Sequence, residues 1–143
     1  MSYQSGLNAE NKFKSLLNAG GFESVFIDDY YDFNVWTSPK RDPIHVEVKS
    51  VALSVKKGGL KHKTNRGIGA FEFKNSENLE KLKKDDGWVC LIIRINDEYI
   101  VFGFIKARNI RQKRFLSIHQ AKELGAITFD KWLFMIGEKG ASQ

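Results

Sequence analysis

Two acids and a lysine stand at positions that a pair of neighbouring strands would bring together. Glu47 and Lys49 lie two residues apart in a segment rich in β-branched residues, so a strand places both on one face. The turn-forming stretch 38–43 joins this segment to an upstream strand that begins at Asp32. Antiparallel pairing across such a turn predicts that Asp32 lies near Glu47 and Lys49.

A third acid falls on the apolar side of the first expected helix. This helix begins after an N-cap at Ser5 and ends near Ala19, before two glycines. Glu10 is three residues from both Leu7 and Phe13, which predicts that it lies on the buried face. A buried carboxylate costs free energy unless a cation meets it, so we expect Glu10 to approach the same point as the other acids.

Carboxylates that converge in this way repel one another unless a cation separates them, and oxygen-rich sites select Mg²⁺ or Mn²⁺. A metal held by Asp32 and Glu47 could polarise a phosphodiester, and Lys49 could orient or deprotonate the attacking water. Asp28 and Asp29 compete with Asp32, but they precede the apolar alternation of the strand. The alternative is an ordinary surface salt bridge between Glu47 and Lys49, with Asp32 as a turn acid.

Positive charge is concentrated in two stretches of a chain whose net charge is +6. The stretch 54–66 contains cations and no acid, namely Lys56, Lys57, Lys61, Lys63 and Arg66. The stretch 108–114 is similar, with Arg108, Arg111, Lys113 and Arg114. Clustered cations favour a polyanion such as DNA, and with no acids nearby we expect them to be solvated and available to phosphates. A solvated loop and a solvated helix face are the alternative.

The remaining pattern predicts an α/β fold with a mixed sheet in one domain, 1–143. We expect strands at 24–27, 32–37, 44–51, 88–95, 99–105 and 127–136, and helices at 76–84 and 117–124. The glycine-rich stretch 54–69 is expected to be a mobile loop, and Phe71 and Phe73 beside it to pack in the core rather than stack on bases. The core of the domain is expected at about 5–95 and a C-terminal hairpin, helix and strand at about 96–137.

Composition excludes several classes of protein. Apolar residues make up 42% and charged residues 28% of the chain, which is typical of a globular domain. The longest uncharged apolar run is far shorter than a membrane span, no leader is visible, and the single Cys90 forbids an internal disulfide. A cytoplasmic protein without membrane contact is expected. No complete P-loop is present, so no nucleotide cofactor is expected.

The segments Gly6–Glu10, Tyr31–Trp36 and His45–Ser50 together resemble the motifs of the PD-(D/E)xK nuclease superfamily. The order of these motifs, and the link at 19–23, look like archaeal Holliday-junction resolvases. The resemblance implies a restriction-endonuclease-like αβββαβ core with a central mixed sheet flanked by helices. Tyr31 stands where the family has proline, and the helix at 76–84 offers Asn78 or Lys81 in place of the glutamine of many members.

Carried over to this sequence, the resemblance implies that Asp32, Glu47 and the Val48 carbonyl bind Mg²⁺, for which Mn²⁺ can substitute. Lys49 would act on the water, Glu10 would complete or support the metal shell, and His45 is a secondary candidate for touching the phosphate. The expected activity is that of a DNA endonuclease, of the structure-specific resolvase type. The alternatives are a restriction or transposon-end enzyme and a non-catalytic nucleic-acid-binding module. Because two strands must be cut, a homodimer is expected.

Overall fold

A mixed β-sheet with helices on both faces organises the computed structural model, which describes residues 2–19, 23–26, 33–36, 42–56, 59–61, 70–73 and 76–141. The helices are α1 (Ser2–Ala19), α2 (Ser76–Lys84), α3 (Ile118–Glu123) and α4 (Phe129–Ala141), with a short 3₁₀ helix, η1 (Ala107–Asn109). The strands are β1 (Glu23–Phe26), β2 (Phe33–Trp36), β3 (Ile44–Lys56), β4 (Gly59–Lys61), β5 (Ala70–Glu72), β6 (Trp88–Ile95), β7 (Glu98–Lys106) and β8 (Phe115–Ser117).

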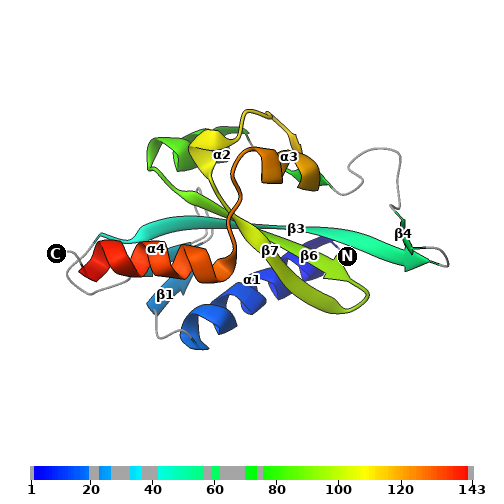
Figure 1. The fold of residues 1–143 in the computed structure, drawn as a ribbon, viewed down its shortest axis with the longest axis horizontal. Coiled ribbons are helices and arrows are strands. Elements are labelled where there is room, and N and C mark those ends of the chain that lie inside the picture. The colour runs from blue at the N-terminus through cyan, green and yellow to red at the C-terminus, as the bar shows by residue number, and fades with distance from the viewer. Residues whose placement is uncertain are drawn as a thin grey trace.

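The main sheet has the strand order β1-β2-β3-β6-β7 (Figure 1). β1, β2 and β3 form an antiparallel meander, and β6 pairs with β7 as an antiparallel hairpin. The two central strands, β3 and β6, run parallel. Parallel neighbours need a long crossover connection, and here this connection contains α2. The prediction of an α/β fold with a central mixed sheet is therefore confirmed.

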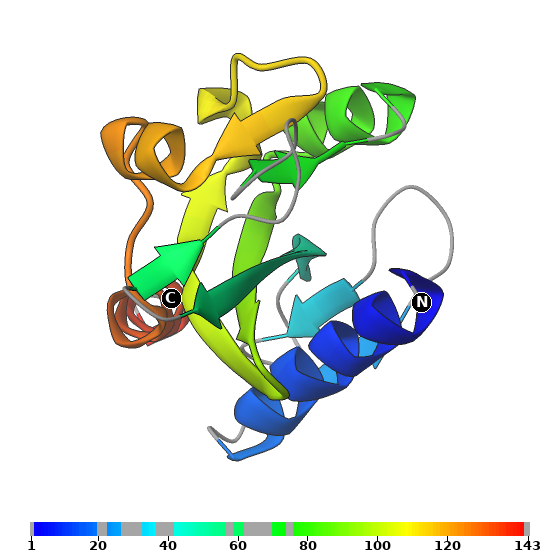
Figure 2. The same ribbon diagram turned by 90° about the vertical axis from the view of Figure 1, so that its right-hand side faces the viewer.

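One face of the sheet is covered by α1 and α4. Along β3, Val46 and Val48 point to this side and pack with Phe13 of α1 and Trp132 of α4 in one apolar cluster. Both views show α1 and α4 on the side of the sheet away from α2 and α3 (Figures 1 and 2). Because residues alternate along a strand, Glu47 and Lys49 belong to the other face.

The other face is covered by α2, α3 and a second, two-stranded sheet in which β5 pairs with β8. Phe71, Phe73 and Leu116 are buried there against Leu91 of β6, which confirms that the two phenylalanines pack in the core. The sequence analysis missed β5 and β8. The alternation of apolar and polar residues over Phe71, Glu72 and Phe73 was the available signal.

Two expected element boundaries are wrong: the start of the first helix and the end of the third strand. α1 begins at Ser2, so Ser5 lies inside the helix and is not its cap. β3 continues through Lys56, and Ser54 pairs with Lys61 in a hairpin with β4, so this part of the expected loop is extended backbone. Val55 and Leu60 pair within this hairpin. Residues 57–58 and 62–69 lie outside the described residues.

The last expected strand, 127–136, is also wrong, because most of it lies in α4. Ile127 makes only an isolated antiparallel bridge to Phe104, and the helix follows at once. The Thr128 hydroxyl accepts a hydrogen bond from the Lys131 backbone N–H at 3.2 Å, which is typical of a helix N-cap. The burial of Trp132 and Ile136 four residues apart follows a helical period, and this spacing outweighs the β-propensity of the segment.

In the described ranges, none of the helices combines the length and the apolar character that crossing a membrane requires.

Candidate active site

Glu47 is an acid buried in the middle of β3. It is 6% exposed, and no other charged residue in the described part of the chain is buried to this degree. The Lys49 Nζ atom lies 3.4 Å from Glu47 Oε2, so the pair expected from the two-residue spacing is formed. Because the Glu47 side chain is 8% exposed and that of Lys49 26%, this is a largely desolvated ion pair, unlike a surface salt bridge.

The position of Lys49 is fixed from two sides. Its ammonium group lies 5.4 Å from the centre of the Phe73 ring, just after β5, while it faces the Glu47 carboxylate. A cation over the face of an aromatic ring is attracted by the ring quadrupole, and Phe73 is itself buried. The second sheet therefore holds the lysine against the acid, which the sequence analysis did not anticipate.

His45 lies two residues before Glu47 on the same strand and is half-buried. Its Nδ1 atom lies 2.7 Å from Asn34 Oδ1, and the strand register pairs these two residues directly across β2 and β3. Because an amide oxygen only accepts, Nδ1 carries the proton in this hydrogen bond. Burial lowers the pKa of His45 below its usual 6.5; Lys81 acts in the same direction, against the carboxylate of Asp85.

This depressed pKa predicts a pH-dependent stability. Below about pH 6.5 the unfolded chain binds a proton that the folded protein binds less readily, so stability is lost as the pH falls through this value. We expect His45→Asn to flatten the dependence of the unfolding free energy on pH between about 7 and 5, where one proton accounts for at most about 1.4 kcal/mol per pH unit. Urea unfolding at several pH values measures it.

The control for this experiment is His119→Asn, which removes an imidazole whose side chain is 82% exposed. An equal flattening in both variants, or none in the His45 variant, would contradict the prediction.

Glu10 is half-buried on α1. Its neighbours Ala9 and Phe13 pack with Val46 and Val48, whose side chains point away from the face that carries Glu47. The apolar side of α1 thus lies against the opposite face of the sheet. The expectation that packing of α1 on the sheet brings Glu10 close to Glu47 stays a prediction.

Asp32 directly precedes β2 in the sequence and lies outside the described residues, as do Asp28 and Asp29. Within the part of the chain that is described, no three His, Cys, Asp or Glu side chains gather closely enough to hold a metal ion. The donor chemistry of Glu47 still suits a hard divalent cation, because a buried carboxylate is the ligand type that Mg²⁺ takes. Val48 is buried beside it on β3.

The cations of the stretch 108–114 are not all available to a partner, contrary to expectation. Arg114 pairs with Glu72 at 2.9 Å and Arg108 with Asp86 at 3.4 Å, although both arginine side chains remain about two-thirds exposed. Ile110, which is 1% exposed, anchors the segment between them, while Arg111 and Lys113 are exposed, as expected. In the other stretch, the backbones of Lys56 and Lys61 lie in the β3–β4 hairpin, whereas Lys57, Lys63 and Arg66 fall outside the described residues.

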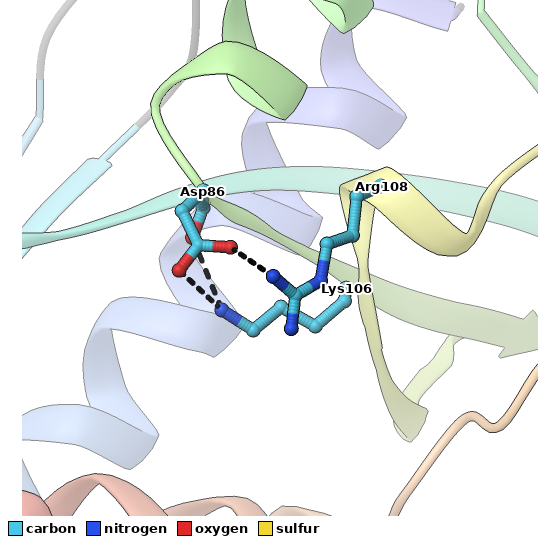
Figure 3. Close-up of polar contacts among 3 residues, drawn as sticks. All are labelled: Asp86, Lys106 and Arg108. Carbon is cyan, nitrogen blue, oxygen red and sulfur yellow. Dashed lines mark hydrogen bonds and ion pairs between the residues drawn. The ribbon is translucent and has the colours of Figure 1, made fainter.

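A second group of charges, which the sequence analysis missed, lies where β7 ends (Figure 3). The Asp86 carboxylate faces Lys106 Nζ at 3.0 Å and Arg108 at 3.4 Å, and the Asp86 carbonyl accepts a hydrogen bond from the same ammonium at 3.3 Å. Asp86 has a φ of 57°, the left-handed region that an aspartate tolerates in a turn. The sequence signal for this group was the turn-forming stretch 85–87, which follows α2 and contains Asp86.

This sheet and its flanking helices have the restriction-endonuclease-like fold. Among solved structures it is similar to Hjc, a Holliday junction resolvase from the archaeal hyperthermophile Archaeoglobus fulgidus. The TM-score is 0.50 and the sequence identity 11%, and the likeness covers 89% of this chain and 93% of that chain. No protein-family model and no curated protein matches the sequence. The likeness establishes the fold.

Proposed function

We propose that the protein is a metal-dependent endodeoxyribonuclease that acts on branched DNA. One observation carries the proposal: a buried carboxylate, Glu47, faces Lys49 at 3.4 Å on the central strand of a restriction-endonuclease-like sheet. A buried acid beside a lysine is costly to maintain for stability alone, because desolvating the two charges can cost more free energy than their attraction returns. A structural neighbour is a Holliday junction resolvase, which favours the branched substrate.

The proposed cation ligands are Asp32, Glu47 and the Val48 carbonyl, with Glu10 completing or supporting the shell. The register of the sheet supports the pairing of the two principal acids, because Phe33 pairs with Val46. Asp32 precedes Phe33 in the sequence and Glu47 follows Val46, so antiparallel strands bring these neighbours together if the pairing continues by one residue.

When bound, Mg²⁺, or Mn²⁺ in its place, would polarise the phosphodiester and lower the pKa of a coordinated water. The protein's own contribution is to hold the reacting groups. Lys49, held between Glu47 and the Phe73 ring, would orient the attacking water or exchange a proton with it, and these two contacts support that role. Glu47 supplies the negative charge that retains both the cation and the lysine.

The test is a cleavage assay with Mg²⁺ or Mn²⁺ on four-way junctions, flaps, linear duplexes and single strands. We expect cutting near the branch of junctions, and none in excess EDTA. Binding of these DNAs without cleavage of any of them would instead support the non-catalytic module. Preferred cutting of one linear sequence would support the restriction type. Light scattering should give the mass of a dimer, and a strictly monomeric mass would remove that part of the proposal.

The basic stretch 54–66 predicts a salt-dependent contact with DNA phosphates. We expect replacement of Lys56, Lys57, Lys61 and Lys63 by Ala to weaken binding of all DNA substrates alike, because phosphate contacts carry no sequence information. The slope of log affinity against log salt should fall by about 0.9 for each phosphate that the variant no longer neutralises. Titrations at several salt concentrations measure it, and Lys131→Ala, on the exposed side of α4, is the control. An unchanged slope would show that these four lysines do not bind the phosphates.

A further inference from the structure

The Lys49 ammonium contacts the protein on two sides, which limits the directions from which a substrate can reach it. An ammonium group carries three N–H donors and no acceptor. One side faces Glu47 Oε2 at 3.4 Å, and another faces the Phe73 ring, whose centre is 5.4 Å away. The Lys49 side chain is 26% exposed, so its remaining side opens to solvent. A water or a phosphate oxygen therefore approaches the ammonium from this open side.

The two contacts make different contributions to the position of the ammonium. Glu47 and Lys49 both belong to β3, so their ion pair needs no other element. An ion pair alone leaves a lysine side chain many rotamers, because the ammonium is a compact charge on a flexible stem. The Phe73 ring comes from the second sheet and attracts the ammonium to its negative face. This second contact fixes the direction in which the free side of the ammonium points.

The Phe73 ring is itself held in place. Phe73 is 2% exposed and belongs to the same buried apolar cluster as Leu91 of β6. Its backbone N–H donates a hydrogen bond of 2.6 Å to the carbonyl of Arg114, directly before β8. The ion pair between Arg114 and Glu72 at 2.9 Å joins the same two segments. The ring that meets Lys49 is therefore anchored by a distant part of the chain.

We propose that Phe73 is a positioning residue for DNA cleavage, whose ring holds the Lys49 ammonium by cation–π attraction with its open side toward the reacting water or phosphate. The inference rests on the proposed nuclease function and extends it by making the β5–β8 sheet part of the active site. Loss of this attraction should slow the chemical step without weakening DNA binding, because the buried Phe73 side chain offers DNA no surface.

The first experiment tests the contact itself, without DNA. Protons that lie above the face of an aromatic ring resonate upfield, so the methylene protons next to Lys49 Nζ report on the Phe73 ring in NMR spectra of protein with isotope-labelled lysine. Lys49→Arg identifies the resonance, and we expect Phe73→Leu to abolish its upfield shift. The internal control is Lys106, whose ammonium lies 4.9 Å from the centre of the Trp88 ring and should keep its own shift. An unchanged Lys49 resonance in folded Phe73→Leu would overturn the inference.

The second experiment weakens the attraction of the ring while nearly keeping its size. Phe73 is replaced by phenylalanines that carry one, two or three fluorine atoms, because fluorine withdraws electron density from the negative face of the ring. We expect the single-turnover rate of junction cleavage to fall stepwise along this series, by about ten-fold in all, a factor typical of a largely desolvated cation–π contact. The affinity for DNA, titrated in EDTA, should not change. Phe73→Leu should lose a similar factor in rate.

Phe71 provides the matched control series. It lies two residues earlier in β5, about 7 Å along a strand, and is fully buried in the same apolar cluster. Fluorination of Phe71 alters the core in the same way and should leave the cleavage rate unchanged. An equal fall in both series would show that packing is the cause and would overturn the inference. If Phe73→Leu unfolds, the fluorinated proteins, checked by circular dichroism, decide alone.

The outcomes also separate this inference from the function on which it rests. Absence of cleavage of every DNA by the unaltered protein would overturn both. Cleavage that stays constant along the Phe73 series would leave the proposed function standing and overturn the inference alone. A fall in DNA affinity along that series would place Phe73 in the DNA-binding surface and would likewise overturn its positioning role.

Discussion

Replacement of Glu47 by Gln should lower the rate of DNA cleavage by about 100-fold or more while DNA binding is retained or strengthened. Glutamine keeps the size of the side chain and removes the charge that Lys49 and the proposed cation require. Loss of a metal-binding or proton-handling group typically costs factors of this order or larger. Binding should not weaken, because a carboxylate close to the phosphates repels them.

Single-turnover cleavage of a junction and titration in EDTA measure the two quantities separately. Glu98→Gln is the matched control, since Glu98 is an exposed acid at the start of β7 and its loss should leave both quantities unchanged. Circular dichroism and thermal unfolding of the Glu47 variant show whether the fold persists. Full cleavage by a folded Glu47→Gln protein would remove Glu47 from the mechanism.

Replacement of Trp132 by Ala should destabilise the protein by about 3–5 kcal/mol, a large fraction of the stability of a typical domain. Trp132 is fully buried and its ring stacks on that of Phe104 at 4.1 Å, with an interplanar angle of 7°. It also contacts the rings of Phe13 and Trp88, so it joins α4 to α1 and to the sheet. Its removal would leave a cavity at the centre of this cluster.

Trp132→Phe should cost less than Trp132→Ala. Phenylalanine keeps an aromatic ring against Phe104, and it removes the indole Nε1–H, a buried side-chain donor without a hydrogen-bond partner among the described residues. Phe134→Ala, at the exposed neighbouring position, should change the stability by less than about 0.5 kcal/mol. Urea unfolding measures all three, and near-native stability of Trp132→Ala would show that α4 is not part of the core.

The sequence predicted the centre of the fold well because local and non-local preferences agree there. The expected helix at 76–84 and strand at 88–95 coincide with α2 and β6. β6 is apolar from Trp88 to Ile93 because both its faces are buried over most of this length, and no competing period obscures the pattern. The spacing of Glu47 and Lys49 likewise predicted that they share a strand face, because this needs no knowledge of the rest of the fold, whereas their ion pair was expected only in the alternative.

The sequence did not predict features that depend on distant partners. Lys49 is held by Phe73 from a second sheet, and β5 exists only because β8, far along the chain, pairs with it. Short strands of this kind carry little local signal. The segment of α4 contains β-branched and aromatic residues that favour a strand, and its helical packing depends on the sheet surface formed by β7.

The parallel pairing of β3 with β6 has a consequence for how the chain folds. The antiparallel pairs β1–β2 and β6–β7 join segments that are close in the sequence, so each can form early as a local hairpin. The centre of the sheet cannot close until the whole crossover, with β4, β5 and α2, has folded back over one face. Glu47 lies at this late seam, paired in register with Val89 of β6. The lysine–carboxylate pair, although local to β3, therefore becomes buried only when the two halves of the sheet join, and a chain halted before that step would expose the unpaired edges of β3 and β6 to other chains.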